Sequence, residues 1–223
     1  MDTYLEIGQK RVFAAALDWP GWCRSGRDED AALRALLDYA PRYAAVAKRA
    51  GLPFSSPDST AVFTIMERLP GGATTDFGAP EAIPASDRRP LGSAELARFG
   101  ALLAACWSVY DAIAAAAAGV ELRKGPRGGG RELEAITHHV LGGEQGYLSR
   151  LAWKIDKGKA TDLNEEMRLT RQATMDALSA AERGQIPERG PRGGVIWPAR
   201  YFVRRVAWHV LDHAWEIMDR SPQ

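Results

Sequence analysis

Four long stretches with helical hydrophobic spacing, all after residue 92, constrain the fold of this chain more than any other feature. In each stretch apolar residues recur every three or four positions, which places them on one face of a helix. Such helices bury their apolar faces most simply against one another, so the sequence predicts a four-helix bundle. The stretches are Ser93 to Gly119, about Arg131 to Trp153, Asp162 to Arg183, and about Pro198 to Arg220.

The N-terminal part has a different pattern, in which short extended runs flank one helical segment. Residues 3–17 are predicted to be extended, with two apolar runs separated by a turn-like Gly-Gln-Lys, which favours a β-hairpin. A helical pattern follows from Asp28 to Arg49, and Pro41 predicts a kink or break in it near Tyr39. The run Ala61 to Met66 is extended again. This order predicts a small sheet with a helix on one face.

Glycines and prolines concentrated between residues 71 and 92 separate these two parts. The predicted organisation is therefore an N-terminal unit over residues 1–70, a linker over 71–92 and the bundle over 93–223. The predicted fold class is α+β, with a small sheet-plus-helix unit followed by a four-helix bundle.

Composition argues against several classes of partner. The net charge is +1, which gives no electrostatic basis for binding nucleic acid or an acidic membrane. The N-terminus lacks a signal-peptide pattern, and no apolar run approaches the roughly 18 residues of a membrane span. Cys23 and Cys106 lack a CxxC partner, which suits reduced thiols. We therefore expect a cytoplasmic protein.

The four histidines form two pairs, each on a predicted bundle helix. His209 and His213 are four residues apart, so they share one face of the last helix with apolar residues and should point inward. His139 lies on the apolar stripe of the second bundle helix, whereas His138 lies on a more mixed face. We predict that His139, His209 and His213 bind a divalent metal, with His138 as the alternate to His139.

Three neutral imidazoles would leave the full charge on a bound Zn²⁺, which would lower the pKa of a bound water or thiol toward about 7. Hydrolysis and thiol transfer are both open to such a site. Glu144, Asp212 and Glu216 are candidate catalytic groups, and Glu216 and Arg205 could orient the imidazoles. Each could instead belong to a solvated helix face or a local ion pair.

Two loops repeat the pattern Gly-Pro-Arg-Gly-Gly, at residues 125–129 and 190–194. Neither has the Gly-Lys-Ser/Thr ending of a phosphate-binding loop, so nucleotide binding is not indicated. Arg127 and Arg192 could bind an acidic cofactor at the mouth of a pocket, or the loops could be only flexible connections.

The residues Thr137 to Glu144, the His-x-x-x-His at His209 to His213, and the number and order of the helices resemble the DinB-like superfamily over about residues 93–220. The resemblance implies Zn²⁺ or Ni²⁺ held by His139, His209 and His213, a homodimer, and a low-molecular-weight thiol such as mycothiol or bacillithiol. The second and third helices of that family run parallel, which requires a long crossover. Because only about Lys154 to Thr161 separates them here, either the second helix ends early or the topology differs.

Residues Leu17 to Leu33, with Pro20-Gly21 before a helix that starts with acidic residues, resemble the core of HicB-type antitoxins. The resemblance covers about the first 70 residues, and a plain strand–turn–helix unit would explain the same pattern. The sequence favours a metal-dependent thiol transferase or hydrolase acting on a small molecule. The alternative is a non-enzymatic binding or regulatory protein that uses the HicB-like unit.

Overall fold

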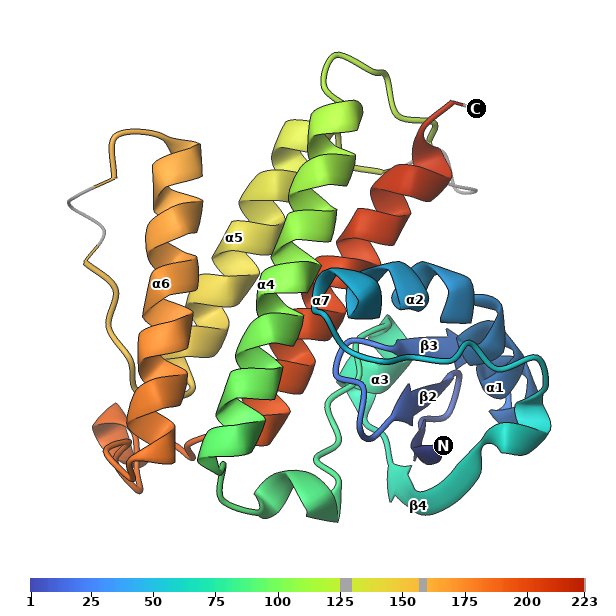
Figure 1. Cartoon of the computed structure of the whole chain (residues 1–223), viewed down its shortest axis with the longest axis horizontal. Helices are drawn as coiled ribbons and strands as arrows, with labels where there is room; N and C mark the ends of the chain where they lie inside the picture. Colours follow the sequence, from blue (N-terminus) through green and yellow to red (C-terminus); the bar gives the residue numbers. More distant parts are fainter. Residues whose placement is uncertain (125–129, 157–159, 223) are drawn as a thin grey trace.

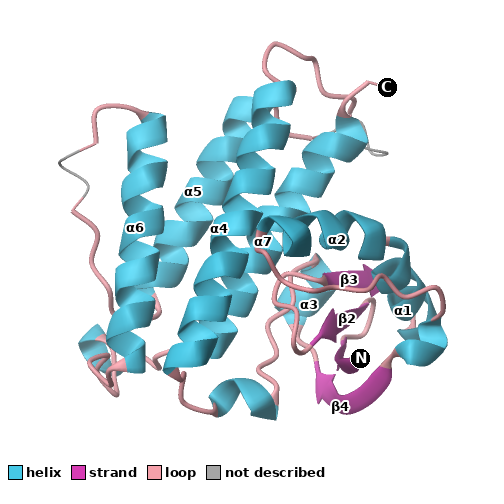
Figure 2. Ribbon diagram, in the orientation of Figure 1, coloured by secondary structure: helices cyan, strands magenta, loops and turns pink. Residues whose placement is uncertain are grey.

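The computed structural model describes residues 1–124, 130–156 and 160–222, and it has the predicted α+β arrangement (Figure 1; Figure 2). The strands are β1 (Asp2–Ile7), β2 (Val12–Ala16), β3 (Cys23–Gly26) and β4 (Thr64–Pro70). The helices are α1 (Glu29–Asp38), α2 (Ala40–Arg49), α3 (Ala73–Phe77), α4 (Ser93–Ala116), α5 (Leu133–Ser149), α6 (Leu163–Glu182) and α7 (Ala199–Arg220), with short 3-10 helices at Thr60–Val62, Ala85–Arg88 and Pro191–Gly193.

The four strands form one sheet in the order β3-β2-β1-β4. β1 and β2 make the predicted antiparallel hairpin, and β4 pairs with β1 in parallel. The sequence did not indicate β3, because it has only four residues and most of them are polar. The break between α1 and α2 falls at Tyr39, as predicted. The backbone N–H of Ala31 donates to the Asp28 side chain at 2.8 Å, which fixes the start of α1.

In the helical part, α5 and α6 run in the same direction, opposite to α4 and α7 (Figure 1). One cavity accordingly touches the C-terminal ends of α5 and α6, at Leu151 and Ala181, and the residues just before α4 and α7, at Leu91 and Trp197. The second bundle helix ends early, at Ser149. Because α5 and α6 run in the same direction, the end of α5 and the start of α6 lie at opposite ends of the bundle (Figure 1).

The sheet and the bundle share α7. Buried residues of β2 and α1 belong to the same hydrophobic core as buried residues of α4, α5 and α7. On the other face of the sheet, Phe13 packs edge-on against Trp208 of α7, with ring centroids 6.3 Å apart. Gly21 has a φ of +94°, and a Cβ there would lie 2.9 Å from the side chain of Leu211. This close approach lets the turn after β2 lie directly on α7.

The segment predicted as a linker, 71–92, is ordered and holds the two parts together. It contains α3 and a 3-10 helix, and Asp87 in that helix forms a buried ion pair with Arg204 of α7 at 2.7 Å. Arg204 also donates to the backbone carbonyls of Ala16 and Leu17. One buried guanidinium therefore links the sheet, this segment and the bundle.

Within the described part of the chain, α4 is the one helix long and apolar enough to cross a membrane by length and composition alone. The sequence pattern understated the length of this apolar segment, because scattered polar residues interrupt it. Half of the apolar window of α4 is buried inside the protein. Both cysteines are buried and free.

Candidate metal centre

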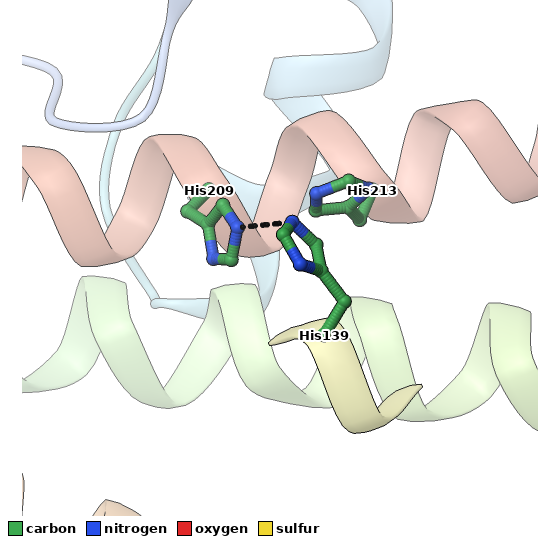
Figure 3. Close-up of side chains that lie close together, drawn as sticks. All are labelled: His139, His209 and His213. Carbon is green, nitrogen blue, oxygen red and sulfur yellow. Dashed lines mark hydrogen bonds between the residues drawn. The ribbon is translucent and has the colours of Figure 1, made fainter. Parts of the chain in front are cut away.

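Three imidazoles converge between α5 and α7. His209 and His213 lie one turn apart on α7, and His139 reaches them from α5 (Figure 3). Their ring centroids are 4.8 to 5.1 Å apart, and one ring nitrogen from each lies within 4.8 Å of the others. The Nε2 atoms of His139 and His209 are 3.3 Å apart.

Gly143 allows His209 to enter this position. A Cβ at Gly143 would lie 2.3 Å from Cε1 of His209, closer than any real side-chain contact. The ring of His209 takes the space that a side chain at position 143 would need. The side chains of His209 and His213 are buried, whereas His139 is exposed. The cluster therefore opens to solvent on the α5 side.

The electrostatic environment favours the neutral form of two of the imidazoles, those of His209 and His139. Burial lowers the pKa of His209 well below its ordinary value, and the neighbouring His213 and His139 lower it further. Burial and the proximity of His213 also lower the pKa of His139. Neutral imidazole is the form that has a nitrogen lone pair to donate to a metal.

Glu216 fixes the orientation of His213. Its Oε2 lies 2.8 Å from Nδ1 of His213, and its Oε1 accepts a hydrogen bond from Arg220 at 2.8 Å. The bond to His213 lowers the pKa of the Glu216 carboxyl, so this group is ionised and can only accept. Nδ1 of His213 therefore donates this hydrogen bond, and Nε2 is the ring nitrogen that remains for a metal. A carboxylate behind a histidine is the usual arrangement around metal-bound imidazoles.

The residues present fit a tetrahedral metal with an open position. Two nitrogens about 2.0–2.1 Å from a metal at the tetrahedral angle lie about 3.3 Å apart, which matches the Nε2 separation of His139 and His209. Nδ1 of His209 is buried without a hydrogen-bond partner among the described residues.

Three of the predicted candidate residues do not contact the histidine cluster in the structure. His138 points outward and lies 3.9 Å from Glu134 on its own helix, so His139 is the member of the pair that joins α7. Asp212 forms an ion pair with Arg24 at 2.8 Å. Glu144 is fully buried and accepts a hydrogen bond from Trp107 of α4 at 2.6 Å.

Of the two arginines predicted at a pocket mouth, Arg127 lies outside the described residues. Arg192 lies in the 3-10 helix Pro191–Gly193, and its side chain lies outside the described part of the chain.

The sequence missed the role of Tyr147, because its place on the apolar stripe of α5 suggested only core packing. Its ring lies edge-on to His209, with centroids 5.6 Å apart, and its hydroxyl accepts a hydrogen bond from Arg205 at 3.1 Å. Arg205, predicted to orient an imidazole, contacts Tyr147 instead. Gly143 and Tyr147 are four residues apart and so share one face of α5, which could have indicated that Tyr147 lies beside the histidines.

Comparisons of the chain with family models, with curated proteins and with solved structures found no match.

Proposed function

We propose that this protein is a metal-dependent enzyme acting on a small molecule, with Zn²⁺ or Ni²⁺ held by His139, His209 and His213. The observation that carries the proposal is the convergence of three imidazole nitrogens from two helices within 4.8 Å. The charged form is disfavoured for His139 and His209, so these rings can act as ligands at neutral pH.

Glu216, His139 and the bound metal would have different roles in this enzyme. Glu216 holds His213 in one orientation, and the exposed side of His139 leaves an approach for a water or thiol. The metal would supply a lowered pKa for that bound water or thiol, which is the requirement for hydrolysis or for thiol transfer. Among the described residues, Glu216 is the one predicted acidic group that bonds to a member of the cluster.

Elemental analysis of the purified full-length protein tests this proposal. We expect about one Zn²⁺ or Ni²⁺ per chain in the wild type and in His138→Ala, and loss of the metal in His209→Ala. His138 is the matched control, because it adjoins His139 in sequence but points away from the cluster. Folded wild-type protein without metal after incubation with either ion, or metal retained in His209→Ala, would overturn the proposal and favour the non-enzymatic alternative.

Thiol transfer and hydrolysis are distinguished by a second measurement. Turnover of electrophilic esters and epoxides is compared with and without a low-molecular-weight thiol, using the metal-loaded protein. A thiol requirement supports the transferase, and turnover in its absence supports the hydrolase.

A further inference from the structure

A second feature lies beside the cluster of histidines. A cavity of about 470 Å³, within the range of small-molecule sites, is bordered by residues of α5, α7 and the segment before α4. It adjoins the histidines through Gly143, which contacts His209, and through Tyr147, whose ring packs on His209. Its walls include three aromatic side chains, those of Tyr147, Trp197 and Tyr201.

Arg205, which also lines this cavity, differs from the other buried arginines of α7. Arg204 pairs with Asp87, Arg200 with Glu95 and Arg220 with Glu216. Arg205 is only 7% exposed, yet no ion pair joins it to a carboxylate in the part of the chain that the structure describes.

The contacts of Arg205 are neutral and leave donors free. Nη2 donates to the Tyr147 hydroxyl at 3.1 Å, and Nη1 donates to the backbone carbonyl of Pro80. Its Nε is buried without a partner among the described residues. A buried charge without a counterion is costly, so a guanidinium that lines a cavity without a counterion indicates that an anion binds in the cavity and neutralises it.

The other charged groups at the cavity do not neutralise Arg205. Glu81 lines the cavity, but its carboxylate is directed to Gly72, where a Cβ would lie 2.5 Å from Oε1. Arg150 lies over the ring of Trp197, with its guanidinium carbon 5.6 Å from the ring centroid, and adds positive charge. The cavity therefore presents aromatic surface and unbalanced positive charge.

We propose that this cavity binds a small organic carboxylate, whose carboxyl group pairs with Arg205 and whose body packs on Trp197, Tyr201 and Tyr147. The inference rests on the proposed function in one respect, which is that the bound molecule is the substrate or the thiol of the histidine site. Arg205 precedes His209 by one helical turn, about 6 Å along the axis, so a ligand of a few carbons spans both. A planar guanidinium with free N–H groups suits a carboxylate, which it can bind through two parallel hydrogen bonds.

Calorimetry on the chelator-treated, full-length protein tests the proposal without any metal. The probes are 3-phenylpropionate and its neutral counterpart 3-phenylpropanamide. We expect the wild type to bind the acid roughly tenfold or more tightly than the amide, and Arg205→Gln to lose this preference. Arg168→Gln is the control, because it removes a positive charge from an exposed ion pair with Glu165 that does not line this cavity, and it should keep the preference.

Equal binding of the two probes by the wild type, or an unchanged preference in Arg205→Gln, would overturn the proposal. If Arg205→Gln does not fold, Arg205→Lys serves instead, and the acid should then bind more weakly than to the wild type because the planar fork is lost. N-acetylcysteine in place of 3-phenylpropionate identifies the source of the carboxylate: tighter binding of N-acetylcysteine assigns the thiol, and tighter binding of 3-phenylpropionate assigns the substrate. Because no metal is present, failure here and failure of the metal analysis are separate results.

Discussion

Helix α5 carries an ionisable side chain toward each of two neighbouring helices, and the two side chains have different surroundings. Toward α7, His139 meets two other imidazoles whose nitrogens face one another, and the pKa of two of the three rings is lowered. Toward α4, Glu144 has a pKa raised by burial to about 7 and accepts one hydrogen bond from Trp107. The two residues are five positions apart, about 140° around the helix.

The difference between the histidine cluster and Glu144 shows how a candidate binding site can be distinguished from a polar side chain that is simply buried in the core. The histidine cluster brings several lone pairs to one point and opens to solvent at His139. Glu144 is completely inaccessible, and the one hydrogen bond that it accepts comes from a neighbouring helix, while its other carboxyl oxygen has no partner among the described residues. A buried polar atom without a partner therefore does not indicate function by itself, whereas the convergence of several potential ligand atoms near an accessible point does.

The largest expected effect concerns metal and stability. Free Zn²⁺ at about a thousandfold above its dissociation constant should raise the free energy of unfolding by about 4 kcal/mol, because metal binds the native cluster and not the unfolded chain. Urea denaturation with and without Zn²⁺ measures this. His213→Ala should show no such gain, whereas His138→Ala should behave as the wild type. A gain of similar size in His213→Ala would place the metal elsewhere.

The second prediction concerns Glu144 and pH. The folded protein holds a proton on this carboxyl up to about pH 7, while the unfolded chain releases it near the ordinary value of 4.5, so stability falls as pH rises through that window. Glu144→Gln should therefore be more stable than the wild type at pH 8, by up to roughly 3 kcal/mol, and nearly equal at pH 4. Denaturation at both pH values checks this, with the exposed Glu134→Gln as control. An active-site role would require a loss of activity in Glu144→Gln at both pH values.

The third prediction concerns the glycines of α5. Gly143→Ala should cost about 1–3 kcal/mol of stability and displace the ring of His209, because the new Cβ would lie 2.3 Å from it. Gly142→Ala has open space around the new methyl group and should gain up to about 1 kcal/mol from helix propensity. Thermal unfolding and metal content of the two variants measure both effects. Equal behaviour of the two would mean that α5 and His209 are not in close contact.

The smallest effect separates the remaining two acidic candidates. Glu216→Gln should weaken metal binding about 10- to 100-fold, because a neutral amide orients and polarises His213 less well. Asp212→Asn, which only breaks the partly exposed pair with Arg24, should leave metal affinity unchanged. Competition with a chromogenic chelator measures both. Comparable losses in the two variants would remove the distinction between them.

The periodic parts of this chain were predictable from sequence, because a helix or hairpin imposes its repeat on the residues it buries. The start of α6 at Asp162 and the break at Tyr39 followed from capping and proline chemistry in the same way. β3 and α3 were missed, because such short elements have too few residues to show a repeat. Their positions depend on pairing and packing with distant parts of the chain.

The histidine site was predictable in part for the same reason. The stripe on each helix selected His139 over His138 and turned both α7 histidines inward. The three acidic candidates could not be separated, since their environments depend on Trp107, Arg24 and Arg220, which lie on other elements or a turn away. The counterion that Arg205 lacks is likewise a property of three-dimensional neighbours and leaves no mark in the sequence.

The shared position of α7 has a consequence for any attempt to cut the protein into pieces. Trp208 packs on the sheet, while its neighbour His209 faces α5. Excising the bundle as residues 93–223 would strip one flank of α7 and leave Arg204 without Asp87. The sheet thus supports the helix that bears two of the three imidazoles, so we expect the geometry of the histidine cluster to be lost when the sheet is removed.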